Sequence, residues 1–164
     1  MIPVFEPSIS LSDKLTVLKS LNKKNISGNS PTVIEFENKF SKHFSRKYGI
    51  AVSNGSVALD VALNCLDLNQ EDEVILPSFT IISCLSAVIR TGAKPVFCDV
   101  NENSWNMEIT DVERCITNKT RAIIMVHTYG LPSDAIKIRE LCDKKEIILI
   151  EDTAEAHGIN IEGR

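Results

Sequence analysis

Cysteine pairs, secretion signals and long apolar runs are all missing from this sequence. Its five cysteines are widely spaced, and no two stand in a CxxC pattern, which argues against both a zinc site and a disulfide framework. The N-terminal MIPVFEPSIS has no basic segment followed by an apolar one, so no signal peptide is expected. Apolar stretches end well before the roughly 20 residues that span a bilayer. We therefore expect a cytoplasmic protein with reduced thiols and no membrane partner.

Several motifs of nucleotide-binding and hydrolytic enzymes are missing as well. The sequence has no GxxxxGKS/T phosphate loop, no GxGxxG and no GxSxG elbow, so P-loop, dinucleotide-binding and serine-hydrolase sites are not expected. His127 and His157 are far apart in the sequence, and neither belongs to an HxH or HxxxH motif. No metal site is therefore expected. The formal net charge is -4 and no Lys/Arg cluster dominates the chain. Nucleic acid is therefore not an expected partner.

The N-terminal part of the sequence predicts two amphipathic helices. The first carries leucines on a single face. The second begins with Ser30 as its N-cap and Pro31 at its first helical position. The polar residues 27–31 break the chain between the two helices. Residues 1–30 are therefore predicted to form a helical segment, and residues 31–164 the first part of a larger domain.

Short apolar runs alternate with helical patterns from Tyr48 onward. The runs lack the two-residue alternation of half-exposed strands, as expected of strands that are buried on both faces. Five strands are expected, at 50–52, 74–76, 96–98, 122–126 and 147–150. Four helices are expected between them, near 56–66, 80–91, 110–116 and 133–145. Gly92 is expected to end the second of these helices and Ser133 to cap the fourth. This order predicts a three-layer α/β fold with a mostly parallel sheet.

Polar residues follow each predicted strand, at the edge where open α/β sheets bind ligands. Gly55 and Ser56 begin a helix there, and the free N–H groups and positive dipole of a helix start suit a phosphate. Ordinary helix capping would explain the same two residues. Glu151 and Asp152 end the last apolar run, and a carboxylate at a buried strand end needs a cation or several donors. A protonated pyridine nitrogen would be such a cation for Asp152. A local Lys or Arg, or a role as a helix cap, would satisfy it equally.

Five segments in this order resemble one known family. The segments are SNGSVALDVAL, DEVILPSFT, GAKPVFCDV, AIIMVHTYGLPSD and LIEDTAEAHG. Together they resemble the DegT/DnrJ/EryC1/StrS family of sugar aminotransferases, which depend on pyridoxal 5′-phosphate (PLP). SGNSPTVIEFENKF resembles an early segment of the same family, so the resemblance covers essentially residues 2–164. It implies part of the large domain of a fold-type-I PLP aminotransferase, a homodimer, an amino-acid donor such as glutamate, and a nucleotide-linked ketosugar as the acceptor.

The resemblance also implies roles for individual residues. Gly55 and Ser56 match the positions that hold the cofactor phosphate. Asp152 matches the catalytic aspartate that pairs with the pyridine nitrogen and keeps the ring protonated, so that the cofactor can accept electrons. Glu155 matches a cofactor-binding position near the ring hydroxyl. Ile81 matches the position that usually carries an aromatic ring stacked on the cofactor, and here it is aliphatic.

Nearby aromatic and histidine residues have less definite expectations. Phe79 is one candidate to supply the ring that is missing at Ile81. His127 and Tyr129 match a strand-end motif of the family to which we assign no role, and His127 is expected to be a packed, hydrogen-bonded residue. Trp105 is expected to contribute packing rather than a substrate contact.

A lysine required by the family is not found in this sequence. The lysine that forms the Schiff base lies well beyond the position of Asp152 in the family, whereas no lysine follows Lys145 here. The chain is therefore expected to be the first part of a longer enzyme, without the C-terminal small domain and inactive alone. Two alternatives remain. One is a deoxysugar dehydratase of the same fold, in which histidine replaces the lysine, and the other is a truncated chain that does not catalyse.

Overall fold

The computed structural model describes residues 6–163, and the chain divides into two compact units between Val52 and Ser53. The parallel sheet lies entirely in the second unit. The domain boundary expected between residues 30 and 31 stays a prediction. No helix within the described residues is both long and apolar enough to cross a membrane.

The first unit contains two helices, α1 (Leu11–Asn22) and α2 (Pro31–His43). Ser10 caps α1 through a reciprocal pair of hydrogen bonds: its hydroxyl accepts the N–H of Asp13, and the carboxylate of Asp13 accepts the N–H of Ser10. Ser30 is the N-cap of α2, with proline next to it, as predicted. Neither helix has a buried residue.

The second unit is built on a four-stranded parallel sheet in the order β2-β1-β3-β4. The strands are β1 (Glu73–Pro77), β2 (Lys94–Cys98), β3 (Thr120–Val126) and β4 (Ile148–Asp152). The helices are α3 (Gly55–Asn64), α4 (Ile82–Thr91), α5 (Ile109–Cys115) and α6 (Ala135–Lys145), with a short 3-10 turn, η1 (Thr128–Gly130). The predicted α/β fold and its parallel sheet are confirmed.

The strand predicted at residues 50–52 is wrong. This apolar segment pairs with no strand among the described residues, and Ile50 is 74% exposed. Its backbone is tied instead by one hydrogen bond from the N–H of Ala51 to the carboxylate of Glu37, at 2.8 Å. An apolar run predicts burial, but it becomes a strand only where a neighbouring strand satisfies its backbone.

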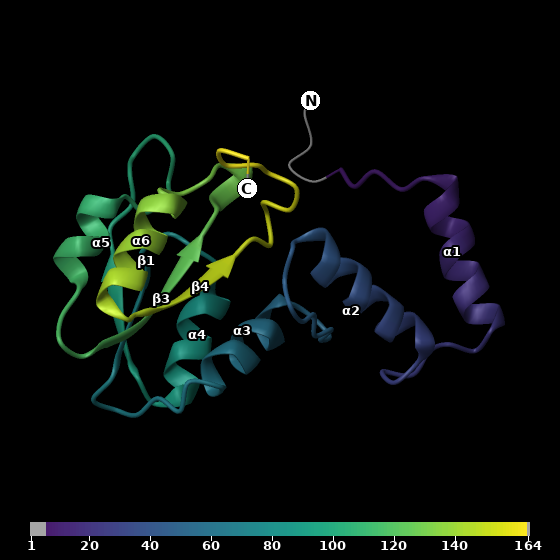
Figure 1. Cartoon of the computed structure of the whole chain (residues 1–164), viewed down its shortest axis with the longest axis horizontal. Helices are drawn as coiled ribbons and strands as arrows, with labels where there is room; N and C mark the ends of the chain where they lie inside the picture. Colours follow the sequence, from purple (N-terminus) through teal and green to yellow (C-terminus); the bar gives the residue numbers. More distant parts are fainter. Residues whose placement is uncertain (1–5, 164) are drawn as a thin grey trace. The chain divides into compact units, whose positions relative to one another are not determined.

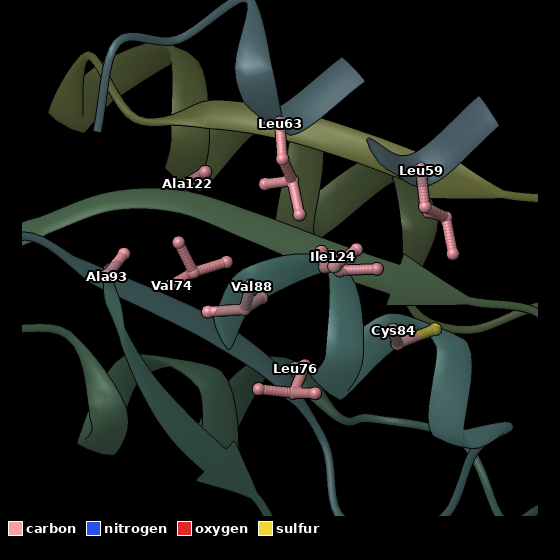
Figure 2. Packing of buried hydrophobic residues seen from close by; sticks show 10 residues of the cluster. Leu59, Leu63, Val74, Leu76, Cys84, Val88, Ala93, Ala122 and Ile124 are labelled. Carbon is pink, nitrogen blue, oxygen red and sulfur yellow. The ribbon is translucent and has the colours of Figure 1, made fainter. Parts of the chain in front are cut away.

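Helices cover the two faces of the sheet in pairs, α3 and α4 on one face and α5 and α6 on the other (Figure 1). Because successive strand residues point to opposite faces, Val74 and Ile124 pack against α3 and α4, whereas Ile75 and Ile123 pack against α5 and α6. Figure 2 shows the first of these cores, in which Leu63 joins the strand residues. All five side chains are fully or almost fully buried.

Two predicted helix ends have different outcomes. Gly92 ends α4 with a φ of 87°, a left-handed conformation that glycine adopts without steric cost, as predicted. Ser133 does not cap α6; the N-cap is Asp134. The Ser133 hydroxyl donates instead to the carbonyl of Val126 at 2.7 Å, so its hydrogen bond holds the end of β3.

Candidate cofactor-binding site

The N-terminus of α3 offers an open position for an anion. Asn54 caps the helix, and its side-chain oxygen accepts the N–H of Val57 at 3.0 Å. The N–H groups of Gly55 and Ser56 meet no acceptor among the described residues. A methyl group added at Gly55 would have no atom within 4 Å. Capping is thus done by Asn54, and the N–H groups of Gly55 and Ser56 remain available as donors to a ligand.

The first turn of α4 connects this helix start to the end of β4. The Ser56 hydroxyl lies 2.7 Å from the hydroxyl of Ser83. The next residue, Cys84, is fully buried, and its thiol lies 3.4 Å from the Thr80 hydroxyl and 3.8 Å from a carboxylate oxygen of Asp152. Burial raises the pKa of the Cys84 thiol, so the thiol keeps its proton and can donate it toward Asp152. The residues predicted to hold the phosphate and the ring nitrogen are thus connected to each other through the first turn of α4.

Asp152 is the last residue of β4 and is half-buried. One carboxylate oxygen accepts the N–H of Ala154 at 3.0 Å, which stabilises the turn after the strand. Among the residues that the structure describes, the other oxygen has only the weak thiol donor of Cys84. No Lys or Arg side chain within residues 6–163 forms an ion pair with Asp152. One oxygen of Asp152 is thus used by the N–H of Ala154, and the second oxygen can still accept a hydrogen bond from a cationic donor.

The two adjacent carboxylates at this strand end point to opposite faces of the sheet. Asp152 lies on the α3–α4 face with Ile150, near Cys84. Glu151 lies on the other face, where one of its oxygens is 2.9 Å from Nε2 of His127. Since alternate strand residues point to opposite sides, Glu151 and Asp152 cannot act together on one ligand atom.

Glu155 and Ile81, the other two predicted site residues, have separate surroundings. Glu155 is exposed, and its carboxylate accepts the backbone N–H of Tyr129 at 2.8 Å. Ile81 is the N-cap residue of α4 and is 64% exposed. The Phe79 ring contacts the ring of Trp105, with centroids 5.0 Å apart. The roles of Glu155 and Ile81 toward a cofactor stay predictions.

Sequence reasoning did not single out Ser83 and Cys84, although they connect the site. A signal was available: these two small polar side chains stand together at the start of a helix that is otherwise largely apolar. Only the packing of α4 beside α3 brings them between Ser56 and Asp152, so no sequence spacing pointed to that contact.

Comparison with known proteins places the chain in a family. It belongs to the DegT/DnrJ/EryC1/StrS aminotransferase family, whose sequence profile matches residues 7–164. It is 42% identical over 163 residues to the GDP-perosamine synthase of Escherichia coli O157:H7, covering 99% of this chain and 45% of that protein. The fold matches an aminotransferase from Psychrobacter cryohalolentis with a TM-score of 0.89 and 38% identity, over 96% of this chain and 40% of that one.

A related dehydratase is similar in fold but more distant in sequence. GDP-4-keto-6-deoxymannose-3-dehydratase, solved with a trapped PLP-glutamate geminal diamine, matches with a TM-score of 0.89 and 25% identity, over 99% of this chain and 43% of that one. The family and its solved relatives are PLP-dependent enzymes. The chain spans about half the length, 45%, of the first curated relatives it matches.

The residues of this site fit the chemistry of PLP. Its phosphate requires hydrogen-bond donors, which the start of α3 and the Ser56 hydroxyl provide. Its pyridine nitrogen, when protonated, requires an acceptor, which the second carboxylate oxygen of Asp152 provides. The α4 residues Ser83 and Cys84 contact both parts of the site.

Proposed function

We propose that the enzyme transfers an amino group to a nucleotide-linked ketosugar, with PLP as its cofactor and glutamate as the donor. The observation that carries the proposal is the carboxylate of Asp152, which has no cationic partner among the described residues and is connected through α4 to an open helix N-terminus. The name of the 42%-identical relative, a GDP-perosamine synthase, supports a nucleotide-linked amino sugar as the product.

In this proposal, the residues of the chain bind and polarise the cofactor. PLP, when bound, supplies the electron sink and carries the amino group between the two substrates. Gly55 and Ser56 hold its phosphate with N–H groups and a hydroxyl. The Asp152 carboxylate accepts a hydrogen bond from the protonated ring nitrogen and so stabilises the charged form of the ring. Glu155 lies toward the ring hydroxyl and Ile81 against the ring face.

We further propose that residues 1–164 bind the cofactor without catalysing the reaction, because no lysine follows Lys145.

We also propose a homodimer, which is supported by apolar residues that α4 leaves exposed, Ile82 at 68% and Ile89 at 57%. We also propose a cytoplasmic location, in keeping with five cysteines that form no disulfide in the structure.

The reaction can be tested in two half-reactions with the full-length gene product. The first mixes the PLP-loaded enzyme with glutamate and measures 2-oxoglutarate. The second adds 4-keto and 3-keto nucleotide sugars, including GDP-linked ones, and identifies the product by mass spectrometry. An aminated sugar is expected. A deoxygenated sugar would show a dehydratase instead, and no reaction with any ketosugar nucleotide would contradict the proposed acceptor.

Cofactor binding can be tested on the chain itself. Pyridoxamine 5′-phosphate (PMP) is a suitable probe, because it has no aldehyde and cannot form imines with surface lysines. Trp105 is the only tryptophan, so quenching of its fluorescence, checked by equilibrium dialysis, reports binding. Saturable binding that Ser56→Ala weakens is expected. Absence of saturable binding would contradict the assignment of the site.

A further inference from the structure

His127 is a fully buried polar residue that the proposed function does not use. Its side chain is 1% exposed, it follows β3 directly, and both of its ring nitrogens are engaged. A buried imidazole with two defined partners has a fixed orientation. His127 therefore connects its two partners, the Glu151 carboxylate and the backbone N–H of Ser133.

The partners define the tautomer of His127. The backbone N–H of Ser133 points at Nδ1 from 3.0 Å, and because a backbone N–H can only donate, Nδ1 must accept. In the neutral ring the proton then resides on Nε2, which lies 2.9 Å from a carboxylate oxygen of Glu151. His127 thus donates a charge-assisted hydrogen bond to Glu151.

These contacts join the carboxyl ends of β3 and β4 beside Asp152. Glu151 immediately precedes Asp152 in β4. The backbone N–H of His127 also donates to the carbonyl of Asp152 at 3.2 Å. On the β3 side, the Ser133 hydroxyl donates to the carbonyl of Val126 at 2.7 Å. The strand end is therefore held from the face of the sheet opposite the Asp152 carboxylate.

We propose that His127 is a positioning residue for Asp152. Through Glu151 and through the backbone of Asp152, it fixes the end of β4 so that the Asp152 carboxylate is held on the α3–α4 face. The proposal rests on the proposed function, because its consequence is measured at the cofactor ring nitrogen. Groups that orient a ligand-binding side chain commonly change affinity by about 10- to 100-fold when removed, as measured at metal sites.

Two substitutions separate the contacts of His127. Glutamine places its amide nitrogen close to the position of imidazole Nε2, so His127→Gln keeps the donor to Glu151. Asparagine places its amide oxygen close to the position of Nδ1, so His127→Asn keeps only the acceptor for Ser133. We expect His127→Asn to weaken PMP binding by about tenfold or more and His127→Gln by less than about threefold.

A spectroscopic readout distinguishes positioning from a general loss of structure. The absorbance of bound PMP, followed as pH is raised, reports protonation of its ring nitrogen. In His127→Asn this transition should move to lower pH, toward that of Asp152→Asn, because a displaced carboxylate stabilises the protonated ring less. In ¹⁵N NMR spectra, His127 should have the Nε2-protonated tautomer. The Nδ1-protonated tautomer would overturn the hydrogen-bond network.

A second pair of variants covers the case in which His127→Asn does not fold. Glu151→Gln keeps an acceptor for Nε2 and should bind PMP nearly as the unmodified chain does, whereas Glu151→Leu removes the acceptor and should weaken binding. Equal affinities within each pair would overturn the proposal. If the unmodified chain fails to bind PMP, or if Asp152→Asn binds it equally well, the proposed function fails first. Weakening by Asp152→Asn but not by His127→Asn or Glu151→Leu would reject the positioning role alone.

Discussion

Replacing Asp152 by asparagine isolates its negative charge. The new side chain has nearly the same shape, and its oxygen can still accept the N–H of Ala154, which lies 3.0 Å from the present carboxylate. No cation among the described residues loses a partner, because none pairs with Asp152. We therefore expect the free energy of unfolding to change by no more than about 0.5 kcal/mol.

The expected effect on the cofactor is much larger. The proposed bond from a protonated pyridine nitrogen to Asp152 is charged on both sides, and hydrogen bonds to charged groups contribute about 1.5–3 kcal/mol. Since 1.4 kcal/mol corresponds to a factor of ten, Asp152→Asn should weaken PMP binding by about 10- to 150-fold. Removing the negative charge of Asp152 would by itself reduce repulsion of the PMP phosphate and strengthen binding. A general charge effect would therefore oppose the expected weakening.

The assay is a PMP titration followed by Trp105 fluorescence and checked by equilibrium dialysis, with urea unfolding to establish that the fold is intact. Asp99→Asn is the matched control, because Asp99 is an exposed carboxylate just beyond β2 that accepts the N–H of Val100. That control should bind PMP within about twofold of the unmodified chain, because an exposed charge is screened by solvent. Unchanged affinity in Asp152→Asn, or an equal loss in both variants, would refute the assignment of Asp152.

Four further predictions concern packing and thiol chemistry. Ile124→Ala should lower the free energy of unfolding by about 2–5 kcal/mol in urea titrations, because this side chain is fully buried in the central strand β3; a change below about 1 kcal/mol would contradict the packing of that core. Gly49→Ala should destabilise the first unit and speed its proteolysis, because the added methyl would meet the Glu37 carbonyl oxygen at 2.5 Å; proteolysis at an unchanged rate would show that the backbone yields. Burial raises the pKa of Cys98 from 9.0 to about 12. The folded chain thus keeps a proton that the unfolded chain releases, and stability should fall as pH rises from 9.0 toward 12. Mass spectrometry after iodoacetamide treatment should find exposed Cys65 modified long before Cys98; equal rates would contradict the burial.

The pattern of apolar runs and helices determined the three-layer α/β fold, because strands buried on both faces must be apolar throughout and the alternating helices allow only parallel crossovers. The pattern failed at residues 50–52, which are apolar but pair with no strand within residues 6–163. Asp152 could be named from the sequence because it ends a predicted strand, at the edge where such sheets bind ligands. Gly55 and Ser56 could be named only as the start of a helix, because the strand expected before them does not form. The family resemblance supplied their roles.

Tertiary structure alone determined how these residues are connected. Because of the pleat of β4, Asp152 points toward α4 and Glu151 points toward His127. The sequence alone does not show which partner each of these adjacent residues contacts. The packing of α4 beside α3 brings Ser83 to Ser56 across 27 positions of the chain. Contacts of this kind depend on which helix faces meet, and this is set by the whole core rather than by local pattern. The sequence therefore indicated the candidate residues, and the folded core determined which of them share a site.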